Sequence, residues 1–180
     1  MKFKKTIAFM LALCTCALLL CSCNKNDDGI PDGMQLVTSE YADCKLFVPN
    51  DWTPEITTGV LVAKASDNSN VSLQKMTPSG QYTSFDAYFR EDYFKKLQNT
   101  YAKITLLEEE CSTENQKFST VQNSALRYVY TVESDGTVYK IMQYFSYYSG
   151  YLYILTYTAQ ENLFAEHLED VYSIAANFVY

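Results

Sequence analysis

Residues 123–159 form a run rich in β-branched and aromatic residues, and only two turn-forming dipeptides interrupt it. These are Asp135-Gly136 and Ser149-Gly150, which suit the positive φ angles that two-residue hairpin turns require. Strands joined by such short turns must be neighbours and antiparallel. The sequence therefore predicts a three-stranded antiparallel meander.

Apolar side chains lie on both faces of these predicted strands. In the third strand Tyr153 and Leu155 share one face, while Leu152 and Ile154 share the other. A strand that is apolar on both faces is covered on both. We therefore expect both faces of the sheet to be at least partly covered.

Tyrosine is concentrated in the same region, because nine of the 16 tyrosines lie between residues 128 and 157. Most are expected to pair across strands beneath the helices. A few should be exposed at the second hairpin, where aromatic rings suit a protein interface. The predicted partner-binding residues are Tyr147, Tyr148, Tyr151 and, in the turn "NDWTPE", Trp52.

The remaining elements follow from periodicity. Three strands are predicted at 41–49, 58–66 and 70–76, and a strand, a turn and the start of another element at 103–118. A helix is predicted after Thr83 or Ser84, with aromatic residues spaced every four positions. A second helix closes the chain over 161–178 and places the single histidine, His167, among acidic residues on its polar side. We interpret His167 as a surface residue.

Two stretches are similar to the PsbP/Mog-like group. "FVPNDW" resembles the turn after the first strand of that group, and "YLYILTYTAQENLFAEHLEDVYSIAANF" resembles its closing strand and helix. The resemblance implies an α+β fold, mainly an antiparallel β-sheet with helices on both faces (an α/β/α sandwich). It carries no catalytic residues and implies a protein-binding module.

The N-terminus has the order of an export signal. Lysines precede an uncharged apolar run over 6–20, which is shorter than the about 20 residues of a spanning helix. Leu20-Cys21-Ser22-Cys23 then resembles the bacterial lipobox, which implies that Cys23 is acylated and becomes the mature N-terminus. The predicted partner is the lipid bilayer and the predicted location is the extracytoplasmic face of the cell membrane.

The domain prediction follows from this signal. We expect a signal peptide over 1–22, the lipidated Cys23 with a flexible acidic tether over 23–38, and one globular domain over 39–180. Removing the signal takes three of the 14 basic residues and leaves 11 against 21 acidic ones, a net charge of −10. Such a charge repels nucleic acid, which we exclude as a partner.

Two further sites stay open at this stage. Cys44 and Cys111 either form a disulfide, which an exported location permits, or remain two buried thiols, which we favour. The tether resembles a single thrombospondin-type calcium repeat, with oxygen ligands at alternating positions, although an ordinary acidic tether is the preferred interpretation. The candidate calcium ligands are Asn24, Asn26, Asp28 and Asp32.

No catalytic constellation is apparent in the mature chain. It has one histidine and lacks G-x-S-x-G, H-E-x-x-H and C-x-x-C motifs, so we expect no enzyme and no cofactor. The sequence favours a membrane-anchored, non-catalytic binding or accessory module whose partner is a protein of the cell envelope. The alternatives are a lipoprotein that binds a small ligand in a cleft of the sheet and, less favoured, an extracytoplasmic hydrolase.

Overall fold

The structure is a computed structural model that describes residues 29–38, 44–57, 59–78, 84–120 and 123–180. The chain divides into two compact units, Met1–Asp32 and Gly33–Tyr180, and the second contains every named strand and helix. Within the described residues, no helix is long and apolar enough to span a membrane.

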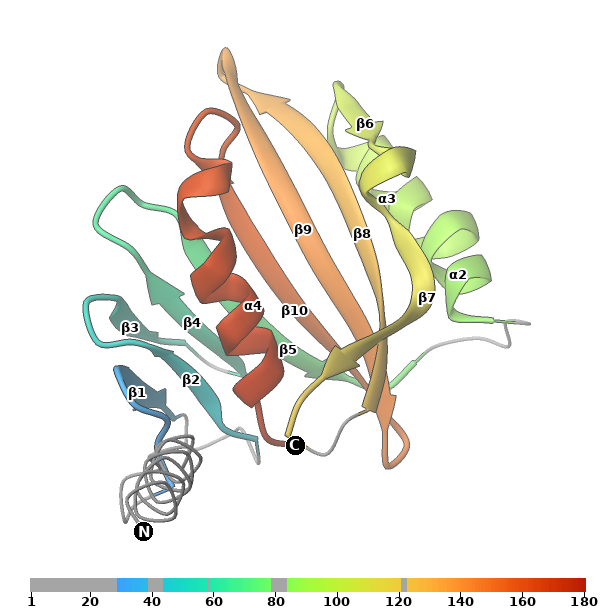
Figure 1. Ribbon diagram of the computed structural model, residues 1–180. Helices are drawn as coiled ribbons and strands as arrows, with labels where there is room; N and C mark the ends of the chain where they lie inside the picture. The colour runs from blue at the N-terminus through green and yellow to red at the C-terminus, as the bar shows by residue number, and fades with distance from the viewer. Residues whose placement is uncertain (1–28, 39–43, 58, 79–83, 121–122) are drawn as a thin grey trace, which may run out of the picture. The chain divides into compact units, whose positions relative to one another are not determined.

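An antiparallel sheet forms the centre of the second unit (Figure 1). Its strand order is β3-β4-β5-β10-β9-β8-β6, and β7 pairs with β8 beside β6. A separate two-stranded sheet joins β1 to β2. The bounds are β1 (Met34–Val37), β2 (Leu46–Pro49), β3 (Thr53–Ile56), β4 (Val60–Lys64), β5 (Asn70–Met76), β6 (Ile104–Leu106), β7 (Ser112–Phe118), β8 (Asn123–Ser134), β9 (Thr137–Tyr148) and β10 (Tyr151–Gln160).

The predicted meander is confirmed as β8, β9 and β10. Both hairpin dipeptides have positive φ angles, 50° and 78° at Asp135-Gly136 and 50° and 88° at Ser149-Gly150. These angles give the two-residue turns whose twist matches that of the flanking strands. β10 then pairs with β5 on its other side, so that Leu155 lies between Tyr144 and Leu73.

The first helical segment begins where the sequence places it. The Ala87 amide donates a hydrogen bond to Ser84 Oγ, which caps α2 (Phe85–Tyr88). The segment continues as a π-helical stretch, η1 (Phe89–Tyr93), and then as α3 (Phe94–Thr100). The spacing of the aromatic residues did not predict the wider, π-helical turn at η1.

The closing segment is shorter than predicted as an α-helix. A 3₁₀ turn, η3 (Phe164–His167), precedes α4 (Leu168–Asn177). Another 3₁₀ turn, η2 (Glu108–Glu110), takes up the three consecutive glutamates at the end of the strand predicted there.

Both faces of the sheet are covered, which confirms the predicted α+β sandwich. α4 and the β1–β2 pair pack on one face, and Figure 1 shows α4 in front of the central strands. The helical segment α2–η1–α3 packs on the opposite face. Alternate residues of β10 therefore enter different cores, Leu155 and Tyr157 on the α4 side and Leu152 and Ile154 on the α2–α3 side.

Two predictions are corrected by this packing. β1 lies inside the segment predicted as a tether, so the folded unit begins at Gly33 and not at residue 39. Trp52 is only 2 % exposed and belongs to the core on the α4 side, so it cannot serve as a surface contact. Its ring meets His167 of η3 edge to face, with 5.4 Å between ring centroids.

Candidate functional site

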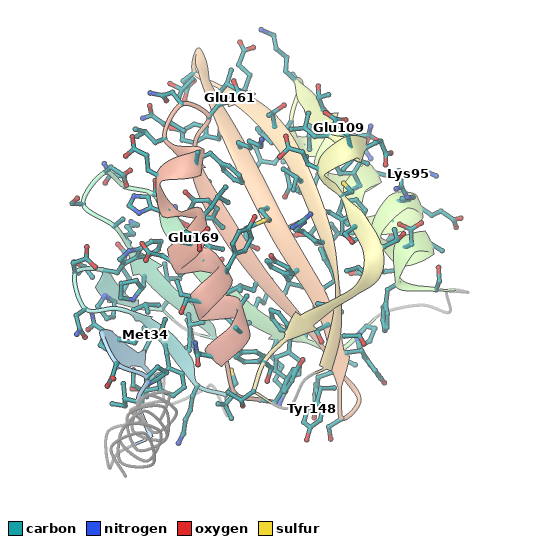
Figure 2. The ribbon with its side chains drawn as sticks, viewed as in Figure 1. Met34, Lys95, Glu109, Tyr148, Glu161 and Glu169 are labelled. Atoms are coloured by element: carbon teal, nitrogen blue, oxygen red, sulfur yellow. The ribbon has the colours of Figure 1, made fainter. Side chains whose placement is uncertain are left out.

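The first candidate region is the end of the β9–β10 hairpin. Tyr147, Tyr148 and Tyr151 are 45 %, 40 % and 40 % exposed, as the sequence predicts, and Phe85 beside them is 37 % exposed. Figure 2 places Tyr148 at the end of the sheet opposite Glu161. We call Tyr147, Tyr148, Tyr151 and Phe85 the tyrosine tip.

The rings of the tyrosine tip are held by neighbours. Tyr148 stacks on Tyr180 with 4.3 Å between ring centroids, and Tyr147 packs against Phe85 at 5.5 Å. Lys75 Nζ lies 3.8 Å from the centroid of the Tyr151 ring, within range for a cation–π interaction. The tip therefore offers ordered aromatic surface and one positive charge.

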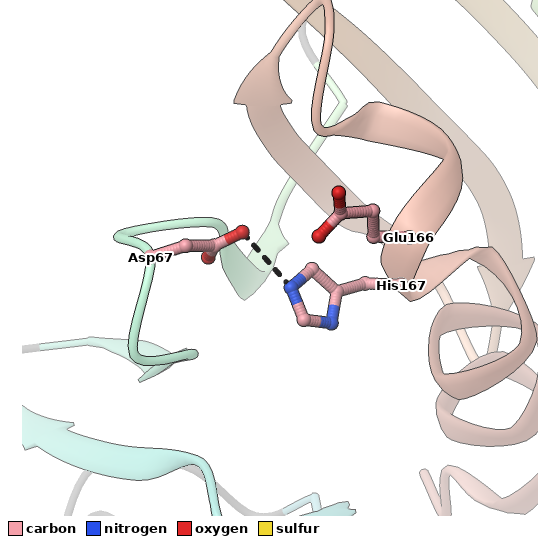
Figure 3. Close-up of side chains that lie close together, drawn as sticks. All are labelled: Asp67, Glu166 and His167. Carbon is pink, nitrogen blue, oxygen red and sulfur yellow. Dashed lines mark hydrogen bonds and ion pairs between the residues drawn. The ribbon is translucent and has the colours of Figure 1, made fainter.

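The second candidate region joins the β4–β5 turn to η3. Asp67 comes from the turn, and Glu166 and His167 come from η3; we call these three residues the acid–histidine cluster (Figure 3). Their nearest carboxylate oxygens and imidazole nitrogen all lie within 4.8 Å of one another.

Local hydrogen bonds position both halves of this cluster. The Ser69 amide donates to Asp67 Oδ1 at 2.8 Å, a bond that side chains of Asp favour in turns. The Tyr157 hydroxyl donates to the carbonyl oxygen of Phe164 at 3.0 Å and so fixes the start of η3 on the sheet. Hydrogen bonds therefore hold the two backbone segments that carry the cluster, the β4–β5 turn and η3.

His167 lies between carboxylates. Its Nε2 is 3.1 Å from Asp67 Oδ2, and its Nδ1 is 3.6 Å from Asp170 Oδ2. Burial favours the neutral form of Asp67, but hydrogen bonds from Ser69 and the contact with His167 outweigh it, so the pKa of Asp67 lies below its ordinary value. Asp67 is thus an anion at neutral pH.

The cluster does not assemble a nucleophile. Within the described residues, the recorded polar contacts of the His167 ring are with Asp67 and Asp170 and not with a hydroxyl or thiol. Acyl-transfer chemistry needs a base within hydrogen-bond reach of a nucleophile. The arrangement instead offers one nitrogen and two carboxylates to a shared ligand.

A surface pocket of about 460 Å³ lies elsewhere, between α3 and β6. The guanidinium of Arg90 borders it and donates to both carboxylate oxygens of Glu108, at 2.6 and 2.9 Å, and to Asp86. Because this cation is already engaged by two carboxylates, it does not invite an anionic ligand. The pocket volume falls in the range of small-molecule sites, but it lies beside the sheet edge and not in a cleft of the sheet.

The other predicted site residues are not brought together. Cys23, Asn24, Asn26 and Asp28 lie outside the described residues, and Asp32 is exposed. Cys44 is buried in the core on the α4 side, whereas Cys111 packs against the core on the opposite face, and the two thiols are not joined.

Sequence reasoning missed the acid–histidine cluster as a unit. Asp67 and His167 are 100 residues apart, and only the fold makes them neighbours. The one available signal was the single histidine flanked by acidic residues on the last helix.

Comparisons with known proteins address the fold. No family model matches the chain, and no curated protein does either. Among solved structures, cyanobacterial PsbP from Synechocystis sp. PCC 6803 matches with 16 % identity, a TM-score of 0.57 and coverage of 87 % of this chain and 98 % of that one.

Two further solved structures agree with this match. The Ran-binding protein Mog1p of Saccharomyces cerevisiae has 11 % identity, a TM-score of 0.55 and coverage of 81 % and 95 % of the two chains. A protein of unknown function from Pseudomonas aeruginosa has 14 % identity, a TM-score of 0.53 and coverage of 79 % and 94 %. Identities this low support the fold alone, and the PsbP/Mog-like fold is thereby confirmed.

Proposed function

We propose that this chain of PsbP/Mog-like fold is a lipid-anchored protein of the cell envelope, and that its domain binds a protein partner through the tyrosine tip. The binding is non-catalytic. The single observation that carries this proposal is a group of exposed aromatic rings, held in fixed positions at one end of the sheet.

The argument for binding rests on exposed area and order. Large aromatic rings dominate the energetics of protein interfaces because each buries much apolar surface and Tyr also keeps a hydroxyl for a hydrogen bond. Tyr148 is already stacked on Tyr180, and Tyr147 already packs against Phe85. Less side-chain entropy is therefore lost when a partner covers them.

The proposed partner is a protein and not an anionic surface or nucleic acid. The mature chain predicted from the sequence would carry 11 basic and 21 acidic residues. Such a surface repels phosphate-rich ligands at long range. Mog1p, which shares the fold, is described as binding the protein Ran, and this favours a protein partner for the same scaffold.

The anchor is proposed from the lipobox-like residues alone. Leu20 and Ser22 flank the acceptor Cys23 at the positions that the motif uses. A diacylglyceryl group supplies two acyl chains, which hold a protein at a bilayer where one chain does not. Cys23→Ser should release the protein from the membrane fraction, and unchanged retention would refute the anchor.

The binding proposal is tested by photocrosslinking in intact cells. A photoreactive phenylalanine analogue replaces Tyr148 in one variant and Val138 in the control; Val138 is 36 % exposed and lies at the hairpin at the other end of β9. We expect one discrete protein adduct from position 148 and none from position 138. Equal adducts from both positions, or adducts with lipid alone, would contradict the proposal.

The adduct identifies the partner, whose affinity is then measured. The partner identified by mass spectrometry is purified and titrated with the wild-type chain and with Tyr147→Ala and Tyr148→Ala. Removing a hot-spot aromatic costs about 2 kcal/mol or more, which corresponds to roughly a thirtyfold weaker complex. Unchanged affinity in both variants would place the interface elsewhere.

A further inference from the structure

We propose that Asp67, Glu166 and His167 form a binding site for a divalent transition-metal ion such as Zn²⁺, with Asp170 as the residue that orients the imidazole. This site lies at the opposite end of β10 from the tyrosine tip and does not depend on the proposed partner binding. Figure 3 shows the three side chains converging from the β4–β5 turn and η3.

The ligand types suit such an ion. Zn²⁺ accepts imidazole nitrogen and carboxylate oxygen, and three protein ligands with one open position is a common arrangement. Imidazole favours Zn²⁺, Ni²⁺ and Cu²⁺ over Ca²⁺ and Mg²⁺, which prefer oxygen alone. Two carboxylates and a neutral imidazole carry a net charge of −2, which matches a divalent cation.

The geometry needs only a small adjustment. Ligand atoms about 2.0–2.1 Å from a tetrahedral ion lie about 3.3 Å from one another. His167 Nε2 and Asp67 Oδ2 are already 3.1 Å apart. Glu166 is exposed, so its carboxylate can close the remaining gap from within 4.8 Å by a change of rotamer.

The groups around the three ligands are placed like the groups that hydrogen-bond to metal ligands in other proteins. Ser69 N–H holds Asp67 Oδ1, so Oδ2 remains turned to His167. Asp170 Oδ2 lies 3.6 Å from His167 Nδ1, on the side of the ring away from the ion. A carboxylate at this nitrogen stabilises the Nδ1–H tautomer that the imidazole adopts when a metal binds Nε2.

Binding exchanges one interaction for another at Nε2. In the metal-free protein, the 3.1 Å contact is a hydrogen bond, which requires a proton between Nε2 and Asp67. The metal displaces this single proton from Nε2, and the proton moves to Nδ1, where it faces Asp170, so the imidazole stays neutral. The two carboxylates, which repel each other without the ion, are then neutralised.

One buried polar atom beside the cluster gives further support. Ser69 is 2 % exposed, and its hydroxyl makes no hydrogen bond of acceptable geometry within the described residues, although Asp67 and Tyr157 lie close enough to interact with it. A buried hydroxyl without a well-aligned partner indicates a missing water or ion, and a metal-bound water would serve Ser69.

The site is tested on the full-length chain by calorimetric titration with Zn²⁺, after alkylation of accessible thiols. The ligand variants are Asp67→Asn, Glu166→Gln and His167→Gln; the first keeps the oxygen that accepts from Ser69. The matched control is Glu169→Gln, which removes the same charge from an exposed position on α4. Each variant is first checked for an unchanged circular dichroism spectrum.

We expect one Zn²⁺ per chain in the wild type and in Glu169→Gln. Each ligand variant should bind at least about 100-fold more weakly, and Asp170→Asn about tenfold more weakly, in line with the effects of outer contacts in other metal sites. Absence of binding by the wild type, or equal binding by all variants, would overturn the proposal.

A spectroscopic measurement separates this site from thiols elsewhere in the chain. Co²⁺ bound to nitrogen and oxygen ligands lacks the sulfur-to-metal charge-transfer band that thiolates give. We expect the Co²⁺ spectrum of the wild type to lack this band. We expect the spectrum itself to be lost in His167→Gln. If His167→Gln kept the full Co²⁺ spectrum, the assignment of His167 as a metal ligand would be wrong. That conclusion would stand even if one of the other ligand variants had failed to fold.

Discussion

The two ends of β10 are different kinds of surface. At Tyr151 the strand begins beside exposed aromatic rings, whereas near Thr158 it pairs with Asn70, close to the turn that carries Asp67. The first end can gain free energy by burying area, and the second by neutralising charge. One fold thus carries two different kinds of surface about 30 Å apart, the length of a ten-residue strand.

The largest expected effect is on stability, and it separates the core beneath the acid–histidine cluster from an exposed surface position. Trp52→Ala removes a ring that is 2 % exposed and leaves a cavity beneath His167, at an expected cost of about 3–5 kcal/mol. Tyr101→Ala, at a residue 39 % exposed, should cost about 0.5 kcal/mol or less. Urea unfolding measures both, and a loss below about 1 kcal/mol for Trp52→Ala would contradict its role as a core residue.

The next effect depends on pH. Burial raises the pKa of Tyr157 to about 12, and the charges of Asp67, Glu166 and Asp170 add to this. Its folded-state pKa is above the unfolded value of about 10, so the stabilisation is complete below about pH 10 and is lost as pH rises toward 12. Two pKa units correspond to roughly 2.7 kcal/mol.

Tyr157→Phe tests whether Tyr157 causes this loss of stability at high pH. It should cost about 1–3 kcal/mol at neutral pH, because the carbonyl of Phe164 loses its donor, and it should flatten the decline of stability between about pH 10 and 12. The measurement is denaturant unfolding in a chelator across that range. Tyr148→Phe is the control at the tyrosine tip, with a neutral-pH change within about 0.5 kcal/mol. An unaltered slope in Tyr157→Phe would contradict the assignment.

The contrast between the ends also explains what the sequence could predict. The tyrosine tip was predictable because Ser149-Gly150 fixes a turn locally and the period of two fixes which rings lie beside it. The helix start at Ser84 and the covered faces of the meander were predictable for the same local reason. The resemblance to the PsbP/Mog-like group implied the fold class, and these elements agreed with it.

The acid–histidine cluster was not predictable because it depends on strand order. Asp67 meets His167 only because β10 pairs with β5 and returns η3 over the β4–β5 turn. β1 was missed because its four residues follow Gly, Pro and Asp and are defined by pairing with β2. Trp52 was assigned to the surface from its turn and residue type, whereas tertiary packing decides its burial.

A double variant tests whether the two ends are independent. Tyr148→Ala removes the stack on Tyr180 and should cost about 0.5–1.5 kcal/mol. It should also speed hydrogen exchange at the Val179 amide, which donates to the Lys45 carbonyl next to that stack. Combined with Asp67→Asn, the two costs should add within about 0.5 kcal/mol, because the sites share no neighbour. A larger coupling energy would show that the ends communicate.

The smallest expected effect concerns the Lys75 ammonium group beside the tyrosine tip. Lys75→Met keeps an unbranched stem beside Tyr151 but removes the charge 3.8 Å from the ring centroid. An exposed cation–π pair contributes about 0.5–1 kcal/mol, so partner affinity should fall about two- to fivefold. Lys103→Met is the control, since Lys103 pairs with Glu133 at 2.5 Å and is distant from the tip in the sheet. Equal losses in both variants would assign the effect to net charge and remove Lys75 from the recognition surface.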